Sequence, residues 1–554
     1  MKRIFLMPLY LLFLKLGVSQ NVGIFTNTPK AHFNVAKDRT VLFGEDSVTH
    51  SQNKFVWYSY KGALRAGYAT ANWDYNLIGF NSTSFGTWSL ASGINSFSAN
   101  SAMALGDQSS AFGLHSSATG FSSFAVGQET LALGESSTAI GSSTKAIGSN
   151  SFTQGYGTKA TGRGAVSFGN ETTARAYASY TIGQYNDSII TSNRDEWLPT
   201  DPLFIIGNGT NFVQRNNALM VLKNGNVGIG TNTPAAKLHV AESPVVFVGP
   251  ATLPGTPAVT PVTGAGTRMM WYADKAAFRV GQVTNLNPTS WNEANIGQLS
   301  FAGGRDARAS GLGSFAYGIL ANAQANHAVA MGEGTLASGV SSVALGSKTI
   351  ASGQNATAMG EETNSSGVSS IAFGRKTVAS GQNAVAMGTE TTASIFSSVV
   401  IGRFNALPLI TNATTWVATD PLFVAGNGTG TGNRSNALTL LKNGNMTIAG
   451  TLTQNSDARL KTNIQPMEPV LPKLEKMQAY TYNWKQPELH GEGQIGLLAQ
   501  EVERAFPTLV KEDAQGNKSV AYTNLVAVLL QAIKEQQATI MHLAKRLEAV
   551  EGKK

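Results

Sequence analysis

Apolar and polar residues alternate with unusual regularity through the second half of the chain. Glycine recurs at every seventh position from Gly332 to Gly388, and an earlier stretch keeps the same spacing from Gly106 to Gly169. In the second stretch the residue before each glycine is alternately apolar and serine: Met331, Leu345, Met359, Phe373 and Met387 against Ser338, Ser352, Ser366 and Ser380. The true period is therefore fourteen residues, which predicts two short β-strands in each repeat.

A fixed period of this kind indicates a solenoid, in which each coil pairs with its neighbours and none folds alone. We expect the glycines to form the corners, because glycine adopts positive φ without steric cost. A coil of fourteen residues encloses almost no interior, and its other apolar positions are small: Ala330, Ala344, Ala358, Ala372 and Ala386. Three copies around an axis would bury this alanine row and the Met/Phe/Leu row, so we predict a homotrimer.

A flexible linker and a calcium-binding roll are two other interpretations of the glycine-rich stretches. A flexible Gly/Ser/Ala-rich linker has the same composition, but it has no reason to keep its phase through ten glycines. A calcium-binding roll places aspartate at fixed positions of a nine-residue repeat. Asp107 is the only aspartate between Gly106 and Gly169, so the solenoid is favoured.

The A-x-A-x-G and T-x-A-x-G cadence of residues 86–186 and 304–405 resembles the head repeats of trimeric autotransporter adhesins of Gram-negative bacteria. The resemblance implies a left-handed parallel β-roll that is trimeric and presents a binding surface outside the cell. Those adhesins end in a membrane-embedded anchor, and this sequence shows no such segment. It therefore predicts a fibre with no integral membrane anchor.

The whole unit around each roll is duplicated. NVGIFTNTPKAHFNV at Asn21 returns as NVGIGTNTPAAKLHV at Asn226, and TDPLFIIGNG at Thr200 returns as TDPLFVAGNG at Thr419. Asn-Gly pairs at 224–225 and 443–444 suit tight hairpin turns. We divide the chain as follows: leading β segments at 20–85 and 226–303, rolls at 86–186 and 304–405, and closing β segments at 187–225 and 406–455.

Composition and the N-terminus narrow the function classes. Charged residues make up 13% of the chain, the formal charge is +8, and no run of five basic residues marks a nucleic-acid site. Absent cysteines exclude disulfides and thiolate chemistry. The histidines show no metal-ligand spacing, so we expect no metal and no cofactor. Residues 1–19 read as a signal peptide with Lys2 and Arg3 before an apolar run. We predict an exported protein, secreted or at the cell surface of a Gram-negative bacterium.

The last 99 residues, 456–554, differ in sequence pattern from the rolls. Apolar residues recur in alternating steps of four and three over about 522–550, which predicts a coiled-coil helix. The members of this heptad seam are Tyr522, Val526, Leu529, Ile533, Gln536, Ile540, Leu543, Leu547 and Val550. Gln536 is the polar member and is expected to set the register. The alternative is a single amphipathic helix on a globular core, and the seam leaves the number of strands open.

Three blocks near the C-terminus, SDARLK from Ser456, GLLAQEVERAFPTLV from Gly496 and AYTNLVAVLLQAIKEQ from Ala521, resemble the intramolecular chaperone of phage endosialidase tailspikes and related tail fibres. The resemblance implies an α+β domain that assembles trimeric β-rich fibres and then cuts itself off with a serine and a lysine five residues apart. Ser456 and Lys461 match that spacing.

A serine hydroxyl becomes nucleophilic when a neutral amine takes its proton, which burial or a nearby cation favours. We expect Lys461 to be desolvated in a closed trimer beside Arg459, and Ser456 to attack the carbonyl of Asn455. The scissile bond is then Asn455–Ser456. The alternative is structural: Ser456 or Asp457 caps a turn and the basic residues are solvated.

The sequence thus predicts a mainly β protein: tandem trimeric left-handed parallel β-roll solenoids, then a C-terminal α+β chaperone domain ending in a coiled-coil helix. The leading function is an exported homotrimeric fibre with adhesin-like or receptor-binding heads, whose ligand is a glycan or a matrix protein. One rival is a glycan-degrading tailspike, for which carboxylates such as Asp38 or Asp74 would have to converge in pairs. The other is a purely structural spacer.

Overall fold

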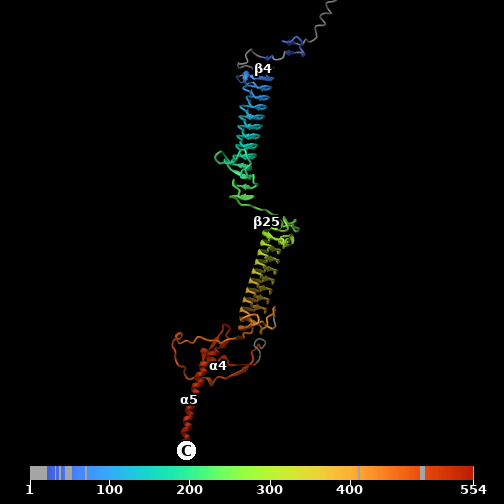
Figure 1. Ribbon diagram of the computed structural model, residues 1–554. Helices are drawn as coiled ribbons and strands as arrows, with labels where there is room; N and C mark the ends of the chain where they lie inside the picture. The colour runs from blue at the N-terminus through green and yellow to red at the C-terminus, as the bar shows by residue number, and fades with distance from the viewer. Residues whose placement is uncertain are drawn as a thin grey trace, which may run out of the picture. The chain divides into compact units, whose positions relative to one another are not determined.

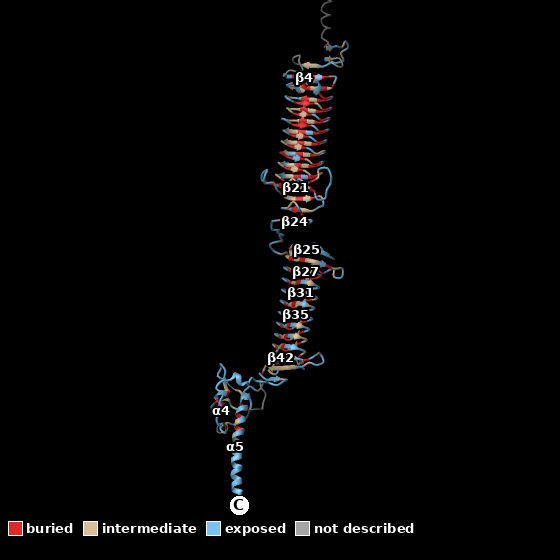
Figure 2. Cartoon of the chain, turned by 60° about the vertical axis from the view of Figure 1, so that its left-hand side comes forward, coloured by how far each residue is buried: buried red, intermediate tan, exposed pale blue. Residues whose placement is uncertain are grey.

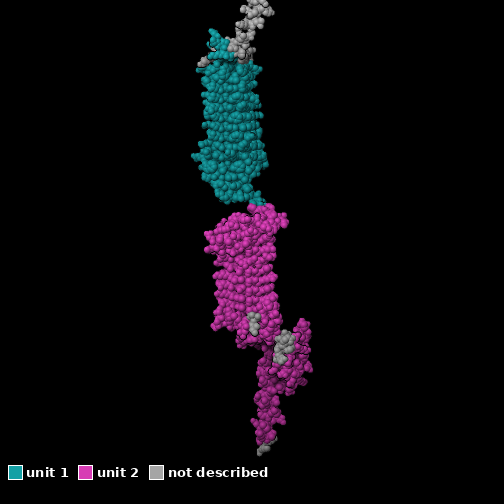
Figure 3. All heavy atoms as spheres, turned by 90° about the vertical axis from the view of Figure 1, so that its right-hand side faces the viewer, with its two compact units in different colours: residues 1–246 teal, residues 247–554 magenta. Residues whose placement is uncertain are grey.

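The computed structural model describes residues 22–31, 33–35, 39–43, 53–68, 71–409, 412–486 and 493–552. The predicted signal peptide and Asp38 lie outside these ranges. The chain forms two compact units, residues 1–246 and 247–554 (Figure 3). Each unit contains a stack of β coils, seen as parallel rungs in Figure 1, and the fold is mainly β, as predicted.

In unit 1 the coils build two parallel sheets. Ala125 pairs with Ala139 on one sheet and Ala132 with Ala146 on the other, so successive coils are fourteen residues apart. The long strands are β6 (Thr83–Phe85), β8 (Phe97–Ala99), β10 (Ser110–Phe112), β12 (Phe124–Gln128), β14 (Thr138–Ser142), β16 (Phe152–Tyr156), β18 (Val166–Asn170) and β20 (Tyr180–Gln184). The short strands are β7 (Leu90–Ala91), β9 (Met103–Ala104), β11 (Ser117–Ala118), β13 (Leu131–Ala132), β15 (Lys145–Ala146), β17 (Lys159–Ala160) and β19 (Thr173–Ala174).

Unit 2 repeats this arrangement, with Ala344 paired to Ala358 and Ala337 to Ala351. Its long strands are β27 (Phe301–Arg305), β29 (Phe315–Ile319), β31 (Val329–Glu333), β33 (Val343–Ser347), β35 (Thr357–Glu361), β37 (Ile371–Arg375), β39 (Val385–Thr389) and β41 (Val399–Arg403). Its short strands are β28 (Arg308–Ala309), β30 (Asn322–Ala323), β32 (Leu336–Ala337), β34 (Ile350–Ala351), β36 (Asn364–Ser365), β38 (Val378–Ala379) and β40 (Thr392–Ala393). The period of two strands per coil is therefore confirmed in both units.

The glycines act differently from the prediction. Most tight left-handed corners are occupied by other residues, such as Asn355 with φ of 56° and Glu362 with φ of 52°. The glycines are required because coils approach closely at these positions: a Cβ on Gly353 would lie 2.0 Å from the carbonyl oxygen of Gly367. A Cβ on Gly360 would lie 1.9 Å from the carbonyl oxygen of Gly374. Only alternate glycines, Gly360 among them, also have positive φ.

The alanine row lies inside each chain's own coil, which corrects the prediction that it packs between copies. In a typical coil the inward side chains are Ala125, Thr130, Ala132 and Ser137, all fully buried (Figure 2). Such small side chains leave little apolar area to bury, so each coil depends on its neighbours for stability.

Leading segments close the first coil of each roll. They comprise β3 (Val41–Phe43), β4 (Asn53–Tyr58) and β5 (Ala63–Tyr68) in unit 1, and β25 (Gly266–Tyr272) and β26 (Ala277–Val283) in unit 2. Each leading segment contains one fully buried arginine, Arg65 in β5 and Arg279 in β26. Burial lowers the pKa of both guanidiniums to about 10. Arg279 donates to the carbonyl oxygens of Ser300 and Ala309, both at 3.0 Å. Arg65 makes the equivalent bonds to Ser82 and Ala91.

Short 3-10 turns complete the leading segments: η1 (Ala71–Trp73), η2 (Tyr75–Leu77), η3 (Ala273–Lys275) and η4 (Glu293–Asn295). Trp73 and Trp291 are fully buried, and their indole nitrogens donate to backbone carbonyls. Trp57 and Trp271, which the duplication also pairs, lie at the surface. A separate two-stranded sheet, β1 (Val22–Ile24) and β2 (Phe33–Val35), precedes the first leading segment.

Closing segments end each roll with antiparallel hairpins. They are β21 (Pro202–Asn208), β22 (Asn217–Leu222) and β23 (Val227–Ile229) in unit 1, and β42 (Pro421–Asn427), β43 (Asn436–Leu441) and β44 (Met446–Ile448) in unit 2. In unit 1, β24 (Leu238–Val240) adds a parallel strand beside β23. Strands β23 and β24 fall within the range predicted for the second leading segment, but they continue the sheet of the first roll instead. Gly225 and Gly444 have positive φ in the β22–β23 and β43–β44 turns, as predicted for Asn-Gly pairs. The duplication thus extends from the leading strands to the closing hairpins.

The C-terminal part of unit 2 is a small α+β domain. Its elements are η5 (Ala458–Leu460), α2 (Leu471–Leu474), β45 (Tyr480–Tyr482), β46 (Gln494–Gly496), α4 (Ala499–Ala505), η6 (Pro507–Leu509), β47 (Val510–Glu512), β48 (Lys518–Val520), η7 (Tyr522–Asn524) and α5 (Leu525–Glu551). The apolar core contains Val470, Val502, Phe506, Leu509, Leu525, Val528 and Ala532. The first turns of α5 therefore belong to the core of this domain.

Candidate self-cleavage site and assembly surfaces

Ser456 and Lys461 meet at the border between the second closing segment and the C-terminal domain. The Asp457 side chain accepts a hydrogen bond from the backbone nitrogen of Arg459 at 2.9 Å and so caps the η5 turn. This turn reverses the chain within five residues, and the Nζ of Lys461 then lies 2.7 Å from the Oγ of Ser456. The spacing that the sequence shows is therefore a contact in space.

Arg459 does not act as predicted. Its guanidinium pairs with the Asp457 carboxylate at 2.6 Å, and the hydrogen bond from Arg459 lowers the pKa of Asp457. In the single chain the positive charge of Arg459 is therefore paired with the Asp457 carboxylate. The structural alternative also holds in part, because Asp457 is a cap and Arg459 is solvated. Capping and the Ser456–Lys461 contact coexist.

Ser456 and Lys461 are both exposed in the single chain. An ammonium group cannot accept a proton from serine, so the dyad needs an environment that favours the neutral amine. Excluding water from the two side chains would supply it. The single chain brings the Ser456 and Lys461 side chains into contact and leaves both of them exposed to solvent.

One contact near this site was not predicted. The side-chain amide of Gln454 donates to the hydroxyl of Thr523 at 3.4 Å, which ties the residue before Asn455 to η7. The partners are 69 residues apart, and no spacing or motif in the sequence connects them. The segment before the Asn455–Ser456 bond thus touches the start of the helix that carries the heptad seam.

The long-strand face of each roll carries an exposed apolar row. In unit 2, Met331 is 39% exposed, Phe373 is 46% exposed and Met387 is 42% exposed, while Leu345 and Met359 are half-buried. In unit 1 the face carries an aromatic run in which Phe97 and Phe112 stack with their ring centroids 5.0 Å apart. Continuous apolar rows of this length are typical of surfaces that another chain covers.

The heptad seam forms a second exposed apolar surface. Most of α5 is coloured as exposed in Figure 2. Of the seam residues, Val526, Ile533 and Val550 are between 61% and 67% exposed. A different face of α5 packs on the domain core through Leu525, Val528 and Ala532. The start of α5 therefore belongs to a globular core, and its seam is exposed to solvent. The coiled coil itself stays a prediction.

Other chemistry is sparse within the described ranges. No three His, Asp or Glu residues there come together as metal ligands. Asp74 lies at the start of η2. None of the helices that the structure describes combines the length and the apolar character needed to cross a membrane.

Comparison with known proteins identifies two kinds of domain. The family model described as "YadA head domain repeat" matches residues 78–97, 98–123, 118–144, 309–335, 323–349, 351–377 and 379–404. The model described as "Chaperone of endosialidase" matches residues 456–511, beginning at the proposed nucleophile.

Two curated relatives are long tail fiber proteins Gp37, from Enterobacteria phages K3 and T2. Each is 34% identical over 99 residues, which is 17% of this chain and 8% or 7% of the relative. This chain thus matches less than a tenth of the length of either relative. On the matches to the two family models, the chain carries two blocks of YadA head domain repeats followed by a C-terminal chaperone-of-endosialidase domain.

Proposed function

We propose that this protein is an exported homotrimeric fibre whose C-terminal domain directs assembly and then releases itself by cutting the Asn455–Ser456 bond. The observation that carries the proposal is the 2.7 Å contact between Lys461 and Ser456, placed where the second head module ends and the chaperone domain begins. Exposed apolar rows on the rolls and the exposed seam of α5 support self-association. Trimeric adhesin and tail fibre relatives support the fibre.

The proposed cleavage uses only the side chains of Ser456 and Lys461 and one water molecule. The Oγ of Ser456 attacks the carbonyl carbon of Asn455 while the neutral amine of Lys461 takes the hydroxyl proton. The C–N bond breaks, the amino group of Ser456 receives that proton from Lys461, and an ester joins Asn455 to Ser456. Water then hydrolyses the ester, which leaves a carboxylate on Asn455 and a free N-terminus on Ser456.

Assembly and cleavage are coupled in this proposal. Parallel coils with small interiors fold through non-local pairing, which is slow and leaves strand edges exposed. A coiled coil formed by α5 holds the chains together at high local concentration while the rolls fold. Closure of the trimer over Ser456 and Lys461 excludes water and favours the neutral amine. Removal of the chaperone then blocks the route back to unfolding, which gives kinetic stability.

Expression of the full chain followed by SDS-PAGE tests the cleavage. We expect the wild type to release a fragment of 99 residues, 456–554, and Ser456→Ala and Lys461→Met to remain full length. Ser519→Ala and Lys545→Met are matched controls in the same domain and should be cut normally. A wild-type chain that stays full length after it has assembled would refute self-cleavage.

Ligand binding is the second part of the proposal. The match to YadA head repeats supports an adhesin-like or receptor-binding role outside the cell, at the surface of or secreted from a Gram-negative bacterium, with a glycan or a matrix protein as ligand. Binding of the assembled, matured protein to glycan and matrix-protein arrays tests this role. Absence of binding on both arrays would favour the structural spacer, and shortening of an arrayed glycan would favour the glycan-degrading alternative.

A further inference from the structure

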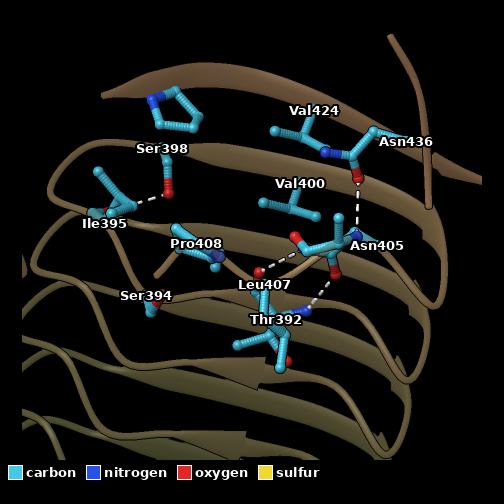
Figure 4. Close-up of a pocket in the computed structure, with 13 residues that line it drawn as sticks. Thr392, Ser394, Ile395, Ser398, Val400, Asn405, Leu407, Pro408, Val424 and Asn436 are labelled. Atoms are coloured by element: carbon cyan, nitrogen blue, oxygen red, sulfur yellow. Dashed lines mark hydrogen bonds between the residues drawn. The ribbon is translucent and has the colours of Figure 1, made fainter. Parts of the chain in front are cut away.

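A surface cavity of about 120 Å³ lies at the end of the second roll (Figure 4). Its walls are mainly apolar and come from β41, β42 and the connections around them: Ile395, Val400, Leu407, Pro408, Pro421 and Val424. The polar groups at its edge are already engaged. Asn405 bonds both backbone groups of Thr392, and Asn436 accepts from the nitrogen of Ala406. An apolar cavity of ~150 Å³ holds a benzene molecule, so this one suits an aliphatic side chain.

The first module is a natural comparison, because the offset of 219 residues between the closing segments equates their positions. In unit 1, Ile189 packs against Ile205 and Met220. The equivalent residues in unit 2 are Pro408, Val424 and Thr439, which fill less space. The polar residue Asp187 is likewise replaced by Ala406, which lines the cavity.

In unit 1 the segment that follows the closing strand covers this region. The amide of Asn232 donates to the Asp187 carboxylate at 2.9 Å, and Asn217 donates to the Asn232 carbonyl oxygen at 2.9 Å. Asn232 comes three residues after the end of β23, which is Ile229. The first module thus folds the residues between β23 and β24 back over the end of its roll.

In unit 2 the chain leaves β44 in the same direction as it leaves β23 in unit 1, but it does not fold back over the end of the roll. The nitrogen of Ala449 donates to the carbonyl oxygen of Ala437 at 2.9 Å, as Gly230 does to Ala218 in unit 1. This register brings the chain after β44 alongside Asn436, at the cavity. The segment then continues to the chaperone domain, and Leu452 is 60% exposed.

We propose that residues 449–455 fold back over the end of the second roll once the Asn455–Ser456 bond is cut, and that Leu452 fills the cavity. This inference rests on the proposed self-cleavage. Ala449 already bonds Ala437, the neighbour of the cavity residue Asn436, and the residues beyond Ile448 add up to roughly 14 Å of extended chain before Leu452. The apolar character also matches, because Ala406 replaces Asp187 in the wall of the cavity and Leu452 is an apolar residue of the tail. The offset of 219 equates Asn232 with Thr451, the residue immediately before Leu452. The new C-terminal segment, residues 449–455, then covers the end of the second roll in the mature fibre.

The absence of cysteine in the natural chain makes disulfide trapping a clean test. Leu452→Cys is combined with Ser394→Cys, which lines the cavity. The control combines Leu452→Cys with Ser366→Cys, which occupies the same row two coils earlier. Two coils are about 9.6 Å apart, beyond the reach of a disulfide. Mild oxidation and peptide mass spectrometry then report which cysteines join.

In the self-cut chain we expect the 452–394 disulfide to form at least ~tenfold faster than the 452–366 control, because the docked tail raises the local concentration. The uncut Ser456→Ala form should lack this preference. Trypsin, cutting after Arg459, whose side chain is 88% exposed, should restore it. If the wild-type dyad stays uncut, self-cleavage is refuted and the trypsin arm alone decides the docking.

Three results would overturn the inference. The first is equal trapping of 394 and 366 in every cut form. The second is preferential trapping of 394 in the uncut chain at the rate of the cut chain. The third is a disulfide that joins two chains, since the proposal assigns each tail to its own roll.

Discussion

Replacing Gly353 by alanine separates the two reasons why a coil needs glycine. Gly353 does not have positive φ, so alanine can adopt its backbone conformation. The added Cβ, however, would lie 2.0 Å from the carbonyl oxygen of Gly367 and 2.6 Å from its carbonyl carbon. Ordinary contact begins at about 3.4 Å, so the two coils must separate by more than 1 Å at this point.

The cost follows from the bonds that cross this junction. Ser352 and Gly353 both donate to the carbonyl oxygen of Ser365, at 3.0 and 3.3 Å, and Ile350 donates to the carbonyl oxygen of Thr363 at 2.8 Å. Losing about three such bonds costs ~3 kcal/mol, and residual strain adds ~1–3 kcal/mol. A loss of about 4–6 kcal/mol lowers the melting temperature by roughly 8–20 °C for a unit of this size. Asn355→Gly, at an exposed left-handed corner of the same coil, should have little effect.

Circular dichroism at a fixed scan rate and hydrogen exchange by mass spectrometry measure both variants. Unit 1 provides an internal reference, because its roll carries no substitution. We expect faster exchange in the coils around residue 353 and a lower melting transition for unit 2. A Gly353→Ala protein that melts within about 2 °C of wild type, with unchanged exchange, would refute the close-approach explanation.

Three further predictions concern other parts of the chain. Arg279→Met should destabilise unit 2 by at least ~3 kcal/mol, because buried carbonyls lose charged donors, and calorimetry should show the unit 1 transition unchanged. The backbone nitrogens of Leu471 and Val470 lower the pKa of Glu535. Stability from this carboxylate is therefore full above pH 4.5 and lost as the pH falls through its lowered pKa, and Glu535→Gln should flatten the acid unfolding profile of the C-terminal domain. Leu543→Asp, in the seam, should reduce the assembled mass measured by light scattering, whereas Lys545→Asp, off the seam, should not; equal masses would argue against coiled-coil assembly.

The duplicated modules show which structural features the sequence pattern predicts and which it does not. Two rolls, their fourteen-residue period and the Asn-Gly hairpins follow from spacing, because period and turn chemistry are local properties. The burial of Arg65 and Arg279 does not, since a lone arginine in a β segment is usually solvated. Its partners, such as Ser300 and Ala309, lie up to 30 residues away and are brought together only by the first coil.

The candidate cleavage site is divided in the same way. Ser456 and Lys461 stand out by their spacing and by the resemblance of the surrounding motif. Whether Arg459 contacts Lys461 or Asp457 depends on the conformation of the η5 turn. In the structure its guanidinium forms an ion pair with the Asp457 carboxylate. The contact from Gln454 to Thr523 depends on how the domain folds, so no local pattern announces it.

By itself the sequence determined the repeat, the duplicated modules, the heptad seam and the five-residue spacing of Ser456 and Lys461, because periodicity and short spacings are local properties of the chain. Only the tertiary structure decided which rows face inward, why each glycine is needed and where the second module lacks volume. The sequence does not distinguish a glycine that is needed for positive φ from one that is needed because two coils approach closely. The distinction lies in the distance to a coil fourteen residues away, and that distance exists only after the chain has folded.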